Sequence, residues 1–147
     1  MNADSYRRVV NIFSKVVVGL QRGGVVFGPM QLLTVKGRRS GQLRTSPIAV
    51  NELNGGRYIF QAYPKAAWVA NVRAAGSVTL TRGRKSSRAR LVEVPVDERG
   101  SLLRELVTTS PASVGNRFVT TGLADAPTPD GVAAAAGRIA VFRVDPA

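Results

Sequence analysis

The first part of the chain carries apolar residues at helical spacing. Between residues 4 and 20 they recur every three or four positions, Asp4 or Ser5 can act as an N-cap, and Gly23-Gly24 follows the end. This pattern predicts an amphipathic helix with Arg7, Arg8 and Lys15 on its polar side. Two interpretations stay open for it: a helix packed on the body of the protein, or a basic face against anionic lipid.

After the two glycines the pattern changes to short β-branched runs separated by turn residues. Such runs predict six strands, over residues 31–35, 44–52, 57–62, 77–82, 86–94 and 138–144. Hairpin turns are expected at residues 37–41, at Asn54-Gly55-Gly56 and around Gly83, because Asn and Gly accept positive φ. Strands therefore dominate the middle of the chain.

Helical patterns return at three places between and after these strands. We expect helices over residues 65–75, ended by Gly76, over residues 97–109, capped by Asp97, and from Pro111 to near Gly122. For residues 124–137, which contain two prolines and four consecutive alanines, we expect a loop with one helical turn. The fold class is thus α+β, a six-stranded antiparallel split β-barrel with covering helices. One domain spans residues 1–147, with residues 1–24 as its N-terminal helix and link.

Composition narrows the chemistry. Lys and Arg number 21 against 9 Asp and Glu, giving +12, and seventeen of the cations are arginine. Four basic residues lie within residues 36–44 and five within residues 82–90, and neither segment contains an acid. An anionic partner is therefore expected. Because the chain has no Cys and no His, thiol and imidazole chemistry and zinc sites are excluded, and we expect no metal.

The sequence also bears on location. It has no run of about 20 apolar residues of the kind a spanning helix requires. It also lacks the pattern of a secretory leader, so we expect a cytoplasmic protein. A weak peripheral contact with an anionic membrane stays open through the N-terminal helix.

The segment Gly37-Arg38-Arg39-Ser40-Gly41, followed by Arg44, combines guanidinium groups with a hydroxyl in a tight loop. Arginine binds phosphate and carboxylate in a bidentate manner, so this loop suits an anion. Ser46-Pro47-Ile48 follows in the next strand, and Trp68 precedes Asn71 by three residues. The pattern resembles the deazaflavin-dependent nitroreductase family, the F420-dependent branch of the split-barrel flavin and deazaflavin oxidoreductases.

The resemblance implies an F420H2-dependent reductase, in which the deazaflavin donates a hydride to a small electron-poor substrate. It assigns the phosphate and polyglutamate tail of coenzyme F420 to Arg38, Arg39, Ser40 and Arg44, with Lys65 as a further cation. It places Ser46, Pro47, Ile48 and Ala49 along the ring, Gln61, Ala62 and Tyr63 opposite, and Trp68 and Asn71 on the closing helix. The residues assigned to cofactor binding are Arg38, Arg39, Ser40, Gly41, Arg44, Thr45, Ser46, Pro47, Ile48, Ala49, Gln61, Ala62, Tyr63, Lys65, Ala67, Trp68 and Asn71.

Several alternatives remain open. Activated alkenes, quinones and nitro compounds are all substrates of such a family. An FMN-binding split-barrel reductase would also need cations, although its single phosphate needs fewer of them. A basic nucleic-acid-binding module would explain the charge, but only 6% of residues are aromatic and we expect no nucleic acid. By spacing alone, Trp68 is an ordinary core residue.

Overall fold

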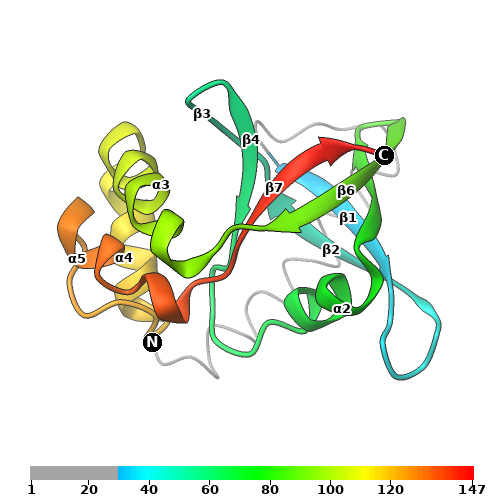
Figure 1. The fold of residues 1–147 in the computed structure, drawn as a ribbon, viewed down its shortest axis with the longest axis horizontal. Helices are drawn as coiled ribbons and strands as arrows, with labels where there is room; N and C mark the ends of the chain where they lie inside the picture. The colour runs from blue at the N-terminus through cyan, green and yellow to red at the C-terminus, as the bar shows by residue number, and fades with distance from the viewer. Residues whose placement is uncertain (1–29) are drawn as a thin grey trace.

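The computed structural model describes residues 30–147, and the expected helix over residues 4–20 lies outside that range. Within it, seven strands form one antiparallel sheet, and helices follow β4 and β6 (Figure 1). In chain order the elements are β1 (Met30–Lys36), β2 (Leu43–Ala49), β3 (Asn51–Leu53), β4 (Gly56–Phe60), α2 (Ala67–Ala75), β5 (Ser77–Arg82), β6 (Lys85–Glu93), α3 (Val96–Thr109), α4 (Ala112–Thr120), α5 (Pro129–Ala133), the 3-10 turn η1 (Ala136–Arg138) and β7 (Val141–Pro146).

The strands follow one another in the order β2-β1-β5-β6-β7-β4-β3. The two edge strands, β2 and β3, are consecutive in the chain and are joined by Val50 alone. We expected one strand over residues 44–52, which was wrong, because the segment changes partner at Val50: β2 pairs with β1, and β3 pairs with β4. The chain thus links both edges of the sheet and curls it into a split barrel, which confirms the α+β fold class with seven strands instead of six.

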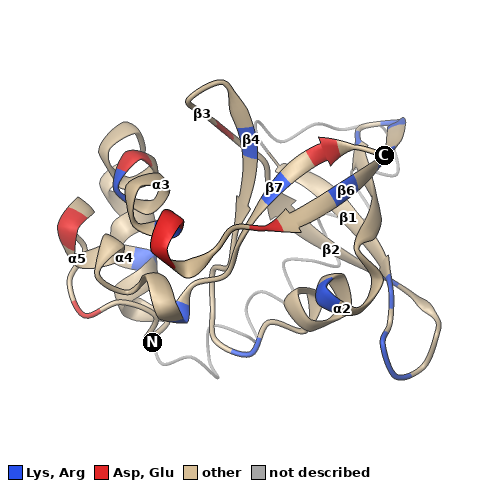
Figure 2. Ribbon diagram, in the orientation of Figure 1, with Lys and Arg blue, Asp and Glu red and all other residues tan. Residues whose placement is uncertain are grey.

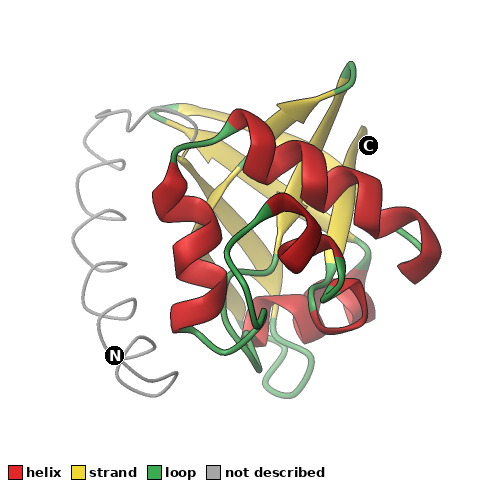
Figure 3. Ribbon diagram, turned by 90° about the vertical axis from the view of Figure 1, so that its left-hand side faces the viewer, coloured by secondary structure: helices red, strands yellow, loops and turns green. Residues whose placement is uncertain are grey.

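Alternation along the strands divides the interior into two cores. On β4, Ile59 faces an inner core that also holds Trp68 of α2, whereas Phe60 faces a second core beneath α3 to α5. On β7, Phe142 belongs to the inner core and Val141 to the second. Figure 3, which faces the helical side, shows these helices in front of the strands. The molecule therefore consists of a curled sheet with α2 packed against its inner core and a helical lobe on its outer side.

Most expected turns and helices are confirmed. Asn54 and Gly55 adopt φ of 50° and 79°, and Gly76 ends α2 with φ 75°. The prediction that Asp97 caps α3 was wrong. Pro95 takes the N-cap position, and its carbonyl accepts a hydrogen bond from Glu98 N–H at 3.0 Å. The last strand begins later than expected because residues 136–138 form a 3-10 turn. No helix among residues 30–147 is long and apolar enough to cross a membrane.

Candidate functional site

The β1–β2 loop is closed by its own hydrogen bonds. Gly37 N–H donates to Gln42 O at 2.8 Å, and Gly41 N–H donates to Gly37 O at 3.0 Å. Gly41 has φ 72°, the left-handed conformation that glycine adopts without strain. The Ser40 hydroxyl accepts from Gln42 N–H at 3.2 Å, so part of its hydrogen-bonding capacity shapes the loop. The loop is therefore a defined turn.

A buried asparagine of α2 fixes this loop from inside the barrel. Asn71 is 5% exposed, and its Oδ1 accepts from the backbone N–H of Arg38 at 3.1 Å and from Arg38 Nη1 at 2.9 Å. A buried amide oxygen is stabilised by such donors, and one of the two is charged. Asn71 thus places the loop and one of its guanidinium groups. The structure therefore brings two of the predicted site residues, Asn71 and Arg38, into direct contact.

The loop cations have no carboxylate partner within residues 30–147, where Arg38, Arg39 and Arg44 are all exposed. A Cβ at Gly37 would lie 3.6 Å from Arg44 Cγ, so the stem of Arg44 runs close beside the loop. The positive charge of these side chains is thus not cancelled by neighbours. Figure 2 shows cations at this hairpin and on α2, and no acid on either of them.

The second cationic segment divides between two ends of the sheet. Because Leu32 pairs with Thr81 and Thr34 with Thr79, the β5–β6 turn lies at the end of β1 opposite the β1–β2 loop. Arg82 and Lys85 at that turn are therefore remote from Arg38. Of the two predicted clusters, residues 36–44 form the hairpin loop itself, and the part of the second cluster at the β5–β6 turn lies away from it.

The predicted residues of β2 do not share one face. Thr45 pairs with Thr34 across the sheet, with their hydroxyls 3.0 Å apart, and lies on the face opposite to the inner core. Ile48 belongs to the inner core and is 7% exposed. Since successive side chains alternate, Arg44, Ser46 and Ile48 lie on one face and Thr45, Pro47 and Ala49 on the other. A flat ligand could contact the side chains of only one of these sets.

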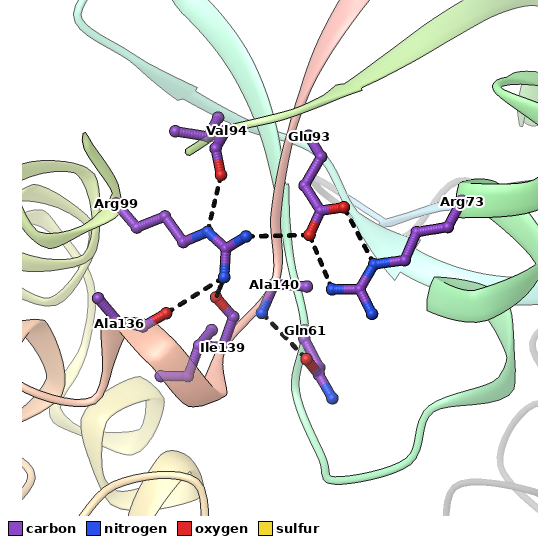
Figure 4. A network of polar contacts seen from close by, with 8 residues as sticks. All are labelled: Gln61, Arg73, Glu93, Val94, Arg99, Ala136, Ile139 and Ala140. Carbon is purple, nitrogen blue, oxygen red and sulfur yellow. Dashed lines mark hydrogen bonds and ion pairs between the residues drawn. The ribbon is translucent and has the colours of Figure 1, made fainter. Parts of the chain in front are cut away.

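The segment after β4 is held by the residue before β7, the strand with which β4 pairs, and by Thr121. Gln61 Oε1 accepts from Ala140 N–H at 3.0 Å (Figure 4). Gln61 N–H also donates to Ala140 O at 2.9 Å, and its Nε2 donates to Tyr63 O at 3.0 Å. The hydroxyl of Thr121, which is fully buried, donates to Ala62 O at 3.1 Å. Both the oxygen and the nitrogen of the Gln61 side-chain amide therefore make hydrogen bonds that hold this segment in place. Thr121 was missed, because nothing in the sequence distinguishes it from other threonines at helix ends.

The remaining predicted residues lie around the start of α2. Trp68 is 5% exposed and packs against Phe142, with ring centroids 5.6 Å apart at 56°, as the core alternative expected. Lys65 is exposed and has φ 57°, an uncommon conformation for a residue with a Cβ. Tyr63 is partly buried against the inner core, and Ala67 is exposed. Lys65 and Ala67 are thus the accessible side chains at this point.

An ion-pair network behind the site escaped the sequence analysis. Glu93 of β6 accepts from Arg73 Nε at 3.0 Å and Nη2 at 2.7 Å, and from Arg99 Nη2 at 2.9 Å (Figure 4). The hydrogen bonds from Arg73, more than the attraction of Arg99, lower the pKa of Glu93 below its ordinary value, and Glu93 raises that of Arg73. Arg99 is 6% exposed. Within residues 30–147, Asn71, Arg99 and Thr121 are the buried polar side chains, and all three hold backbone near the predicted site.

The fold and this basic loop define a split-barrel protein with an exposed, basic hairpin. The family model of F420H(2)-dependent quinone reductases matches residues 5–123. The chain therefore belongs to the F420H(2)-dependent quinone reductase family, which confirms the resemblance. As a member of this family it is an F420-dependent reductase, and its cofactor is coenzyme F420.

Solved structures agree with this fold. An F420-H2 dependent reductase (FDR-A) has a TM-score of 0.53 and 23% identity, with 82% of this chain and 98% of that chain covered. A chain described as a domain-swapped dimer has a TM-score of 0.57 and 22% identity, with 89% and 95% covered. HutZ, the heme storage protein from Vibrio cholerae, has a TM-score of 0.52 and 13% identity, with 90% and 89% covered. No curated protein matches the chain.

Proposed function

We propose that the chain binds the anionic tail of F420 at Arg38, Arg39 and Arg44 and reduces a small quinone with the hydride of the bound cofactor. The observation that carries this proposal is the β1–β2 loop, whose three guanidinium groups are exposed and have no carboxylate partner within the described residues. Charge-assisted hydrogen bonds to a phosphate and several carboxylates would satisfy these groups. A single phosphate, as in FMN, would leave part of this charge unused.

The protein's own contribution is to bind the cofactor and to orient its ring. When bound, the deazaflavin supplies the hydride, so the absence of Cys and His does not prevent reduction. We assign the ring to the space between β2 and the segment of residues 61–63, as the family pattern implies. Gln61 and Thr121 hold that segment through Ala140 N–H and Ala62 O, and so they would keep its backbone at a fixed distance from the ring.

A quinone is the substrate class that the family description favours. Its two carbonyl groups withdraw electrons from the ring and accept the hydride, and reduction is completed by a proton. Tyr63 is the one phenol among the proposed site residues and is the candidate to donate that proton. Activated alkenes and nitro compounds share the electron-poor character, and they form the second choice.

Two measurements test this proposal. Titration of oxidised F420 and, separately, of FMN into the protein should show saturable binding of F420 and much weaker binding of FMN. Reduced F420 that carries deuterium at its hydride-bearing carbon should transfer the label to a benzoquinone or menadione product. Tight binding of FMN together with flavin-supported turnover would contradict the assignment of the cofactor site.

A further inference from the structure

Helix α2 is joined to the helical lobe by a chain of three charged side chains (Figure 4). Arg73 lies near the end of α2 and makes a bidentate pair with Glu93 of β6, with N–O distances of 3.0 and 2.7 Å. Glu93 also accepts from Arg99 of α3 at 2.9 Å. Among residues 30–147, Arg73 and Arg99 are the titratable side chains that lower the pKa of Glu93. Glu93 therefore bridges one guanidinium on each side of the molecule.

Arg99 extends this chain toward the other wall of the proposed site. Its Nη1 donates to Ala136 O and Ile139 O, both at 3.2 Å, and its Nε donates to Val94 O at 2.8 Å. The residue after Ile139 is Ala140, which makes two hydrogen bonds with Gln61. The buried guanidinium of Arg99 thus fixes the short stretch to which the segment of residues 61–63 is attached.

We propose that Arg73 and Glu93, anchored on Arg99, are positioning residues that set α2, and with it the Arg38 loop, relative to the segment of residues 61–63. This inference rests on the proposed placement of F420 between these two walls. Arg73 stands two residues after Asn71, whose Oδ1 holds the loop, so a displacement of the end of α2 reaches the loop directly. The ion-pair chain thereby joins the tail-binding and ring-binding parts of the site.

Apolar packing and the ion pair constrain α2 differently, because only the ion pair depends on direction. Trp68, Val69 and Val72 bury the helix in the inner core, but apolar burial is non-directional and permits small rotations and translations. A bidentate guanidinium–carboxylate pair adds geometric specificity. The apolar face therefore supplies stability, and the Arg73–Glu93 pair supplies the exact register of α2 against β6.

The chain offers a closely matched control for this test. Arg143 makes a bidentate pair with Asp145 at 2.8 and 2.9 Å, and its side chain is 49% exposed, compared with 51% for Arg73. Both residues of that pair lie on β7. Arg73→Gln and Arg143→Gln therefore remove the same charge and the same kind of ion pair, but only the first releases α2.

Binding and amide exchange are measured on the full-length protein. We expect Arg73→Gln to weaken binding of oxidised F420 by about 3- to 10-fold relative to Arg143→Gln, within the range seen for coupling through packed elements. Arg73→Lys should recover part of the loss, since it keeps the charge but not the fork. Without cofactor, hydrogen exchange of the Gly37, Arg38 and Gly41 amides should be faster in Arg73→Gln than in Arg143→Gln.

The outcomes separate the two proposals. Equal F420 affinity and equal loop exchange in the two variants would overturn the positioning role, even where the wild type binds F420 as expected. Failure of the wild-type protein to bind F420 would overturn the proposed site, whereas the exchange difference would still test whether Arg73 fixes the loop. Faster exchange across the whole domain in Arg73→Gln, with a matching fall in melting temperature, would show general destabilisation and would also overturn the positioning role.

Discussion

The sheet with α2 and the helical lobe use arginine in different ways. Residues 30–93 contain twelve cations and two acids, whereas residues 94–140 contain four cations and five acids (Figure 2). In the helical lobe Arg99, Arg104 and Arg138 each pair with a carboxylate. Around the β1–β2 loop, Arg38, Arg39 and Arg44 have no such partner within the described residues.

Under the proposed function, the difference separates cations that maintain the fold from cations that attract the cofactor. A buried guanidinium that is paired with a carboxylate makes its hydrogen bonds within the protein. Its removal leaves the carboxylate and the other acceptors without their donor. Exposed guanidinium groups without acidic neighbours repel one another, and they gain free energy when an anion arrives. Each prediction below therefore separates effects on stability from effects on binding.

The largest effect is expected at Arg99, the buried arginine of the helical lobe. Arg99→Met should lower the free energy of unfolding by about 3 to 5 kcal/mol, because Glu93 and three backbone carbonyls lose a buried donor. Urea denaturation followed by circular dichroism measures it. Arg104→Met is the control on the same helix, since its exposed pair with Asp130 should contribute less than about 1 kcal/mol. Similar losses in the two variants would contradict a structural role specific to Arg99.

The next effect concerns binding and lies at the β1–β2 loop. Arg39→Ala and Arg44→Ala should each weaken F420 binding by about 1.5 to 3 kcal/mol, the range for a lost hydrogen bond to a charged group. The melting temperature should hardly change, because both side chains are exposed. Arg117→Ala on α4 makes the same change in net charge and should leave the affinity unaltered. An equal loss in Arg117→Ala would mean that net charge, and not the loop, attracts the cofactor.

The fold could largely be predicted from local patterns. The Asn54-Gly55 turn, the end of α2 at Gly76 and the alternation on β4 and β7 are fixed by neighbours in the sequence, so they were visible there. The break of β2 from β3 at Val50 was not visible. It follows from pairing with two different strands, β1 and β4. The apolar alternation of Ile48 and Val50 runs up to the break, and its phase changes only after it, between Val50 and Leu53.

The charged residues of the candidate site could be predicted from the sequence, but the hydrogen bonds that hold its backbone could not. The basic loop follows from four cations within residues 36–44. The partners of Asn71, Gln61 and Thr121 lie 33, 79 and 59 positions away, and such contacts depend on tertiary structure. The family resemblance implied that Asn71 and Gln61 lie at the cofactor, and the structure adds that their amide oxygens accept hydrogen bonds from the protein's own backbone.

A smaller effect is expected at Thr121, which connects the helical lobe to the proposed ring-binding segment. Thr121→Val keeps the shape of the side chain but leaves Ala62 O without this donor, and should lower the free energy of unfolding by about 1 kcal/mol. Thr121→Ser should restore the hydrogen bond. Thr120→Val, at the exposed neighbouring position, is the control. Identical unfolding curves for Thr120→Val and Thr121→Val would show that the bond to Ala62 O adds nothing.

The smallest effect is the pH dependence that arises where the sheet meets the helical lobe. The pKa of Glu93 is lowered in the folded protein, first by the hydrogen bonds from Arg73, below the ordinary value of 4.5. The ionised carboxylate therefore contributes stability above that value, and this contribution is lost as the pH falls through the lowered pKa. The difference in unfolding free energy between the wild type and Glu93→Gln should accordingly shrink below pH 4.5. Asp145→Asn is the comparison, since the pKa of its carboxylate is also lowered, first by the hydrogen bonds from Arg143 and last by the attraction of Arg90, which donates no hydrogen bond to it among the described residues. Its difference from the wild type should change less over the same acidic range, and an equal change in both variants would mean that the second arginine, Arg99, does not strengthen the hold on Glu93.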